Sequence, residues 1–218
     1  KAQAKDKLEN FIIKIGYPDK WKDYSGLQVD DSLSLYENMA NISEFFTKDV
    51  IARKVNKPVD KTEWGMTPQT INAYYNPTTN EICFPAAILQ PPFFDPTADD
   101  AMNYGGIGGV IGHEMSHGFD DQGSQFDKTG NQNNWWTAAD KKNFESRTKI
   151  LVDHFNKIEL AGKKVNGQMT LGENIGDNGG LNIAFRALQN VMKTEKLGVK
   201  DGFTPEQRFF LAWARVWA

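Results

Sequence analysis

The chain has 218 residues, 39% of them hydrophobic and 24% charged, and its formal net charge is −3. This composition excludes a disordered or fibrous protein, and the slightly negative charge offers no basic surface for nucleic acid. No apolar run approaches the roughly 20 residues that a membrane span requires, so no transmembrane segment is expected in this chain.

The first 60 residues are expected to form two helices. The apolar residues at helical spacing are Leu8, Phe11, Ile12 and Ile15 in the first helix, and Leu35, Met39, Ile42 and Phe46 in the second. The turn-rich stretch YPDKWKDYSG separates them. We interpret both helices as support for the elements that follow.

The next section, TINAYYNPTTNEICFP, has a different period. Two short aromatic and β-branched runs flank the turn NPTTN, which is typical of a β-hairpin. Cys83, the only cysteine, lies in the second run, so an internal disulfide is excluded and the thiol is expected to be buried. Pro91, Pro92 and Pro96 then predict a rigid loop that leads into the next helix.

Three further helices are predicted after residue 136, and Thr137, Thr170 and Thr204 are expected to begin them. The apolar stripes are Phe144, Leu151, Phe155 and Ile158 in the first of these helices, and Leu181, Phe185, Leu188 and Met192 in the second. The whole pattern predicts an α+β fold that is mainly α, with a small sheet.

Both ends of the chain have the features of a piece of a longer polypeptide. The sequence starts inside a helical pattern without Met or a signal peptide, and it stops inside the apolar stretch RFFLAWARVWA without a cap. We therefore expect the remaining segments of the same polypeptide to be a partner of this chain.

Residues 110–121, VIGHEMSHGFDD, hold two of the three histidines. His113 and His117 lie one turn apart on one helical face, close enough for both imidazoles to reach one metal ion. Glu114 is rotated by about 100° from His113, toward a metal-bound water rather than the metal. The motif predicts a zinc site with a general base, although HExxH is short enough to arise by chance.

Glycines crowd the approach to this motif. Five of them lie between residues 105 and 112, although each glycine inside a helix costs about 0.5 to 1 kcal/mol relative to alanine. They indicate close packing beneath a site, room for a substrate, or a tight crossing of two helices.

A catalytic zinc takes three protein ligands, so a third must be found. The extended pattern HExxHxxGxxH is excluded, because position 120 is Asp and position 123 is Gly. His154 falls on an ordinary amphipathic helix, where a structural role is the better interpretation.

Glu173 and Asp177 are the better candidates, because they lie four residues apart on one helical face. One carboxylate would bind zinc, and the other would accept a hydrogen bond from a ligating histidine. The alternatives are that Glu173 only completes a capping box with Thr170, and that Asp120 and Asp121 are the ligands or the histidine partners.

Five segments occur here in the order and approximate spacing of a known family: NAYYNP, FPAAILQPPFF, NYGGIGGVIGHEMSHGFDDQG, WW and TLGENIGDNGGL. They resemble the neprilysin and endothelin-converting-enzyme family of zinc metallopeptidases. The resemblance implies a thermolysin-like zincin catalytic domain with HExxH and ExxxD helices beside a small sheet. It also implies that residues 1–60 are helical support, part of or leading into the catalytic domain, and that residues 61–218 are the catalytic domain, truncated at its C-terminus.

The same resemblance implies one zinc ion per chain, held by His113, His117 and Glu173. Glu114 would be the general base and proton shuttle, and Asp177 would orient a ligating histidine. In this mechanism zinc lowers the pKa of its bound water toward about 7, Glu114 accepts the proton, and hydroxide attacks the peptide carbonyl. The implied activity is that of a zinc-dependent endopeptidase acting on oligopeptides.

Substrate-binding residues are implied in the same way. Asn72 and Ala73 would bind the backbone of an extended peptide. The residues that match a pocket for the side chain after the scissile bond are Ile88, Phe93, Val110, Val216 and Trp217. Cleavage is therefore expected on the amino side of hydrophobic residues.

The chain also departs from the family pattern. Members carry a histidine that stabilises the oxyanion, a substrate-binding arginine and a large helical domain, and the two residues fall beyond Ala218. Because loss of an oxyanion donor typically costs about 2.7 to 4 kcal/mol, this chain is expected to bind zinc better than it catalyses. The alternative is an inactive zinc-binding fragment that serves as a scaffold. With its single cysteine, this chain resembles the bacterial members more than the animal members, which are cross-linked by disulfides.

Overall fold

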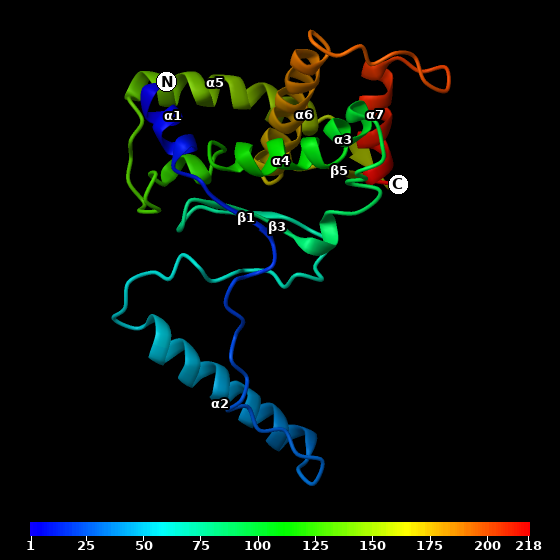
Figure 1. Cartoon of the computed structure of the whole chain (residues 1–218). Coiled ribbons are helices and arrows are strands. Elements are labelled where there is room, and N and C mark those ends of the chain that lie inside the picture. The colour runs from blue at the N-terminus through cyan, green and yellow to red at the C-terminus, as the bar shows by residue number, and fades with distance from the viewer. The chain divides into compact units, whose positions relative to one another are not determined.

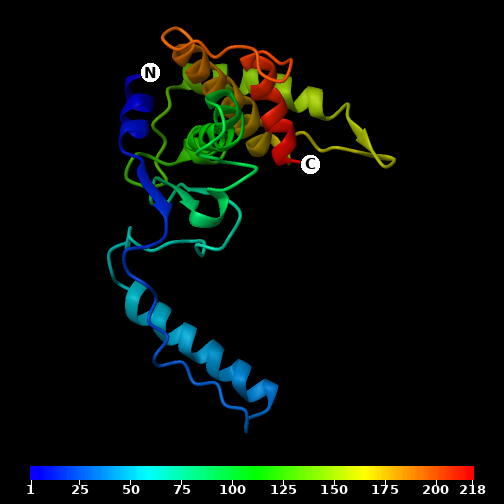
Figure 2. The same ribbon diagram turned by 45° about the vertical axis from the view of Figure 1, so that its right-hand side comes forward.

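The computed structural model describes residues 1–218, which divide into two compact units. The larger unit comprises Lys1–Tyr17 and Met66–Ala218, and the smaller one comprises Pro18–Gly65. Helices predominate, and the larger unit contains a small sheet (Figures 1 and 2). The predicted α+β, mainly α fold is confirmed. None of the helices combines the length and the apolar character that crossing a membrane requires.

The larger unit is organised around α4. Its helices are α1 (Ala2–Glu9), α3 (Asp100–Gly105), α4 (Ile107–His117), α5 (Ala138–Phe155), α6 (Leu171–Val191) and α7 (Pro205–Val216). Its strands are β1 (Ile12–Gly16), β2 (Tyr74–Asn76), β3 (Glu81–Pro85), β4 (Glu159–Leu160) and β5 (Lys163–Lys164). In Figure 1, α4 lies between α6 and the sheet that contains β1 and β3.

The three-stranded sheet has the order β1-β3-β2. Strand β3 pairs with β1 in parallel and with β2 antiparallel, so the predicted hairpin is confirmed. All five residues of β3 are buried, including Cys83 as predicted. Because β2 lies at an edge of the sheet, it is paired with a strand on one side only.

The predicted first helix is wrong beyond residue 9. Helix α1 ends at Glu9, and Ile12–Gly16 form strand β1. An apolar run this short fits the helical period and the strand period equally well. Pairing with the buried β3 favours the strand, and the β-branched isoleucines also suit a strand. Lys14 of this strand is buried and pairs with Glu81 at 2.8 Å.

The smaller unit contains one helix, α2 (Leu35–Lys54). It begins with a capping box between Ser34 and Glu37, and it confirms the second predicted helix. Leu35 and Met39, on its predicted apolar face, are exposed.

Helices α4 and α6 cross at glycines. A Cβ added to Gly112 would lie 2.7 Å from the carbonyl oxygen of Gly180, and one added to Gly180 would lie 2.5 Å from the main-chain nitrogen of His113. Both clashes are with backbone, so neither position tolerates a side chain without moving a helix. The tight helix crossing, one of the predicted uses of these glycines, is present beneath the histidine motif.

Two apolar clusters fix α4 and α6 in place. The first joins α4 to the sheet, and its buried members are Ala73, Ile82, Phe84, Ile88 and Ile107. The second joins α6 to α3 and α7, and its buried members are Ala101, Ala184, Leu188 and Phe209. Leu181, Phe185 and Met192 pack against the second cluster, which confirms the predicted inner face of α6.

The predicted helix starts agree with the structure except in one detail. Thr137 caps α5, and Thr204 forms a capping box at the start of α7. Thr170 precedes α6 but makes no side-chain capping bond. The capping-box alternative for Glu173 is therefore wrong, and its carboxylate extends elsewhere.

The division predicted at residue 60 remains a prediction about domains. The chain passes from the smaller unit into the larger one between Gly65 and Met66. The segment Lys1–Tyr17 belongs to the larger unit, because β1 pairs with β3.

Candidate metal centre

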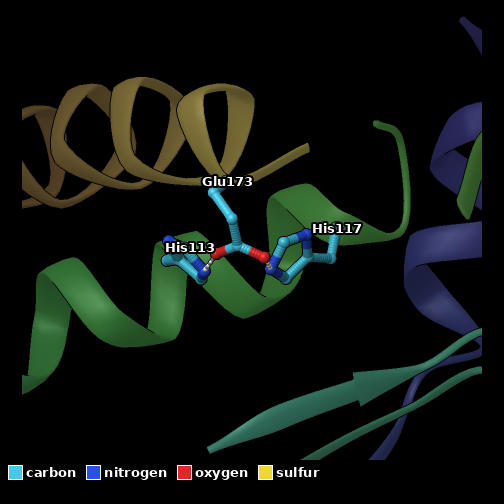
Figure 3. A group of neighbouring side chains, drawn as sticks. All are labelled: His113, His117 and Glu173. Atoms are coloured by element: carbon cyan, nitrogen blue, oxygen red, sulfur yellow. Dashed lines mark ion pairs between the residues drawn. The ribbon is translucent and has the colours of Figure 1, made fainter. Parts of the chain in front are cut away.

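Three side chains from two helices converge at one point. His113 and His117 come from α4, and Glu173 comes from the first turn of α6. The carboxylate of Glu173 lies 3.4 Å from Nε2 of His113 and 3.8 Å from Nε2 of His117 (Figure 3). The two imidazole rings are nearly perpendicular, with centroids 4.5 Å apart. These residues form the one group of three His, Cys, Asp or Glu side chains placed to hold a metal ion.

Both imidazoles turn Nε2 toward this point because carboxylates hold their other nitrogens. Nδ1 of His113 lies 2.9 Å from Oδ1 of Asp177, and Nδ1 of His117 lies 2.8 Å from Oδ2 of Asp120. An ionised carboxylate only accepts hydrogen bonds, so each Nδ1 carries the proton and each Nε2 keeps a lone pair. A histidine that binds a metal through Nε2 needs this tautomer.

Asp120 is the more firmly held of the two carboxylates. Its Oδ1 accepts hydrogen bonds from the main-chain N–H groups of Gln122 and Gly123, at 2.8 and 2.7 Å. Its side chain is 6% exposed, whereas that of Asp177 is 46% exposed. Of the roles predicted for Asp120, the geometry matches the histidine partner rather than the metal ligand.

Glu114 lies beside the histidines and is buried. Burial raises the pKa of its carboxyl, while the charges of His113 and His117 and a hydrogen bond from the main chain of Tyr75 oppose that rise. The net effect is a pKa above the ordinary value for glutamate. A carboxylate with a raised pKa is a stronger base, which suits proton transfer near neutral pH.

The centre attracts positive charge. Burial alone would lower the pKa of His117, but the hydrogen bond to Asp120 and the charges of Glu114, Asp120 and Glu173 outweigh burial and raise it. The same carboxylates would favour a bound metal cation.

Asn72 and Ala73 directly precede strand β2. Oδ1 of the exposed Asn72 accepts a hydrogen bond from the N–H of Ala73 at 2.9 Å, and Ala73 is buried in the cluster beside the sheet. Tyr75 of β2 hydrogen-bonds Glu114 through its main chain, so this edge strand runs beside the base.

The five predicted pocket residues fall into two groups. Ile88 is buried in the cluster between α4 and the sheet, and Phe93 and Val110 pack against it. Val216 and Trp217 lie at the end of α7, outside that cluster, and Trp217 is 67% exposed. The structure thus brings three of the five together.

The other candidates lie outside the centre. His154 is exposed near the end of α5. Asp121 holds neither histidine, and its Oδ1 is buried without a hydrogen-bond partner. Sequence reasoning missed Lys7, which is buried and contacts the loop after α4, because no motif or period distinguishes it from other lysines.

The donor set fits zinc. Imidazole nitrogen and carboxylate oxygen bind zinc at about 2.0 to 2.2 Å, so tetrahedral ligand atoms lie about 3.4 Å apart. Oε2 of Glu173 lies 3.4 Å from Nε2 of His113, and one donor atom from each of the three residues lies within 4.8 Å of the other two. Gly176 makes room for this arrangement, because a Cβ there would lie 2.8 Å from the His113 ring. Three protein donors leave a fourth position for water, as in catalytic sites, whereas a structural site uses four.

Known proteins resemble this chain over its whole length. Residues 72–218 match the model of Peptidase family M13. Neprilysin-11 of Caenorhabditis elegans is 42% identical over 230 residues, which cover 100% of this chain and 27% of that protein. Endothelin-converting enzyme 1 of Rattus norvegicus is 42% identical over 226 residues, which cover 100% of this chain and 30% of that protein.

Solved structures agree with these relatives. The zinc metalloprotease ZMP1 of Mycobacterium tuberculosis, crystallised with an inhibitor, has a TM-score of 0.94 and 50% identity, over 99% of this chain and 34% of that one. PepO of Lactobacillus rhamnosis has a TM-score of 0.87 and 37% identity, over 100% of this chain and 33% of that one. The chain thus spans 27% to 34% of the length of these relatives. On the match of residues 72–218, the chain belongs to Peptidase family M13.

Proposed function

We propose that this chain is the catalytic portion of a zinc-dependent endopeptidase that hydrolyses oligopeptides. One observation carries the proposal: both histidines of α4 have Nδ1 held by a carboxylate and Nε2 turned toward Glu173. With three donors and the buried Glu114 beside them, this arrangement suits hydrolysis better than a purely structural ion. Membership of Peptidase family M13 supports the same activity.

His113, His117 and Glu173 would hold one zinc ion. When bound, zinc supplies a Lewis acid that lowers the pKa of water in the site toward about 7. Glu114 accepts a proton from the attacking water, whose oxygen adds to the carbonyl carbon of the peptide. The same carboxyl then gives this proton to the leaving nitrogen as the C–N bond breaks. Asp177 keeps His113 in the Nδ1–H tautomer throughout.

The substrate would bind as an extended strand. Strand β2 lies at a sheet edge beside Glu114, so a peptide added there would place its backbone next to the base. Asn72 and Ala73 would bind that backbone. The apolar group of Ile88, Phe93 and Val110 supports a preference for a hydrophobic side chain after the scissile bond, with Val216 and Trp217 completing the pocket.

Segments outside these residues would complete the enzyme. The chain spans 27% to 34% of its relatives, so the peptide preference and full activity of the whole protein are part of the proposal. We assign the catalytic role to residues 61–218 and a supporting role to residues 1–60, of which Lys1–Tyr17 lie in the larger unit.

The test combines zinc content with cleavage of a quenched fluorescent peptide, on this chain and on the natural polypeptide that contains it. Glu114→Gln keeps the shape of the side chain but removes the base, so zinc should stay at one per chain while cleavage falls by about 10² to 10⁴-fold. The matched control is Glu195→Gln, at an exposed position outside the centre.

One result would replace this proposal with its alternative. If the natural polypeptide binds zinc but cleaves no peptide of any length, the chain is a zinc-containing binding or scaffold segment. If no zinc binds at all, the endopeptidase proposal and the zinc-scaffold alternative are both wrong.

A further inference from the structure

Lys7 of α1 is a buried lysine whose ammonium group serves one loop. Its side chain is 2% exposed, and Nζ donates three hydrogen bonds of 2.7 Å to the main-chain carbonyls of Gly118, Gly123 and Phe126. These carbonyls lie more than 100 residues away in sequence. The lysine therefore joins the N-terminal helix to the segment that follows α4.

That segment holds the partner of His117. Gly118 is the C-cap of α4, and Gly118 and Gly123 flank Asp120 in the chain. The N–H of Gly123 donates to Oδ1 of Asp120, while the carbonyl of the same residue accepts from Lys7. Gly123 therefore links the ammonium of Lys7 directly to the carboxylate of Asp120, which orients the imidazole of His117.

Lys7 is itself held in place. The side-chain amide of Asn80, which is fully buried at the hairpin turn, donates to the carbonyl of Lys7 at 3.2 Å. The rings of Tyr75, Phe119 and Trp135 surround Nζ at 5.7, 5.6 and 5.9 Å, which favours a cation. The ammonium also lies at the C-terminus of α4, where the helix dipole stabilises positive charge.

We propose that Lys7 is a positioning residue for the metal centre: it fixes the loop from Gly118 to Phe126 and, through Asp120, the orientation of the His117 imidazole. The three hydrogen bonds hold three separate points of this loop to one nitrogen of α1, whereas a single hydrogen bond would hold only one point. The inference rests on the proposed zinc site and adds a residue that the HExxH and ExxxD motifs do not contain.

Lys7 holds the three loop carbonyls in its charged form. Burial lowers the pKa of Lys7 to about 8, while the charges of Asp120 and Asp127 oppose that fall. The group therefore keeps its proton at pH 7. An ammonium has three N–H donors for the three carbonyls, whereas a neutral amine has two.

The first experiment measures zinc affinity of the chain by competition with a chelator. Lys7→Met removes the donors at similar length, and we expect its zinc affinity to fall by about tenfold, the lower end of the effect of losing a partner of a metal ligand. Lys14→Met is the matched control, because Lys14 is also buried in this unit but pairs with Glu81. It should lose thermal stability while its zinc affinity changes by less than about twofold. Equal losses of affinity in the two variants would overturn the proposal.

A double variant tests the route of the effect. If Lys7 acts through Asp120, then Lys7→Met should cost much less in an Asp120→Asn background than in the wild type. A full tenfold loss in that background would show that Lys7 supports only general stability, and the proposal would be wrong. Should Lys7→Met fail to fold, Lys7→Arg takes its place, since it keeps the charge but cannot match three carbonyls with one nitrogen.

A readout without zinc separates this inference from the proposed function. In the metal-free chain, Lys7→Met should accelerate hydrogen exchange at the amides of Gln122 and Gly123, which donate to Asp120, and leave α7 unchanged. Unchanged exchange there would refute the role of Lys7 even if the wild type binds zinc. Accelerated exchange in a chain that binds no zinc would refute the proposed function and leave the loop contact standing.

Discussion

The two histidines of the centre receive the same chemical support from two different kinds of structure. His117 is held by Asp120, which is three residues away in sequence and whose side chain is 6% exposed. His113 is held by Asp177, which is 64 residues away on another helix and whose side chain is 46% exposed. One half of the centre is built by a local loop, and the other half depends on how two helices pack.

This difference shows where each half is vulnerable. The His113 half needs α6 at the right distance from α4, which the glycine crossing provides. The His117 half needs the loop after α4 to hold Asp120 in place, which Lys7 and the main-chain N–H groups of Gln122 and Gly123 provide. Substitutions that damage one half and spare the other test the comparison.

The largest effect is expected at the helix crossing. In Gly180→Ala the new Cβ meets the main chain of His113 and Gly109, so α6 must move and take Glu173 and Asp177 with it. We expect a loss of about 1 to 3 kcal/mol in the free energy of unfolding, together with loss of tight zinc binding. The measurements are chemical denaturation and chelator competition.

A graded control accompanies this variant. Gly198→Ala should change neither property, because nothing lies within 4 Å of its added Cβ. Equal behaviour of the two alanine variants would contradict the role given to the crossing.

The next largest effect is expected in the His117 half. In Asp120→Asn the main-chain N–H groups of Gln122 and Gly123 should keep the side-chain oxygen in the place of Oδ1. The new NH₂ group then faces Nδ1 of His117, and because two donors cannot share a hydrogen bond, the imidazole proton moves to Nε2. That tautomer cannot bind a metal through Nε2, and we expect zinc affinity to fall by roughly 100-fold. A chelator titration that gives a wild-type affinity would show that Asp120 does not set the tautomer.

A smaller effect is expected from the matching change in the His113 half. Asp177 is half-exposed, so the amide of Asp177→Asn can turn its oxygen toward Nδ1 and its NH₂ group toward water. We expect a loss of about tenfold in zinc affinity and no measurable loss of stability. If this variant proved worse than Asp120→Asn in the same titration, the comparison between the two halves would be wrong.

The smallest effect concerns pH in the metal-free chain. The folded-state pKa of His117 is raised, so the folded chain binds this proton more tightly than the unfolded one. The resulting stability is fully present below about pH 6.5 and is lost as pH rises through the raised pKa. Denaturation should therefore show a larger difference between wild type and Asp120→Asn at about pH 6 than at about pH 9. A constant difference would contradict this assignment.

Local patterns predicted much of the fold. The hairpin around Cys83 and the helix starts at Thr137 and Thr204 depend on short-range chemistry, and the structure contains them. Strand β1 was missed because Ile12 and Ile15 fit a helical period as well, and only the distant β3 decides between the two.

The candidate centre was predictable to the same extent. His113 and His117 stand one turn apart in any helix, helical spacing made Glu173 and Asp177 candidates, and family resemblance chose Glu173 as the ligand. The role of Asp120 stayed one of several alternatives, because its choice between metal and imidazole depends on a folded loop. Lys7 had no signal, since its three partners are carbonyls that every residue has.

We infer that one metal ion binds Nε2 of both α4 histidines while each Nδ1 keeps its proton and donates it in a hydrogen bond to a carboxylate. Nitrogen-15 NMR of the three imidazoles during a zinc titration tests it directly, with His154 as internal reference. We expect that Nε2 of His113 and His117 shifts at one equivalent of zinc, that both Nδ1 atoms stay protonated, and that His154 does not respond. Binding through Nδ1, a response of His154 in place of either α4 histidine, or no saturable shift would contradict it.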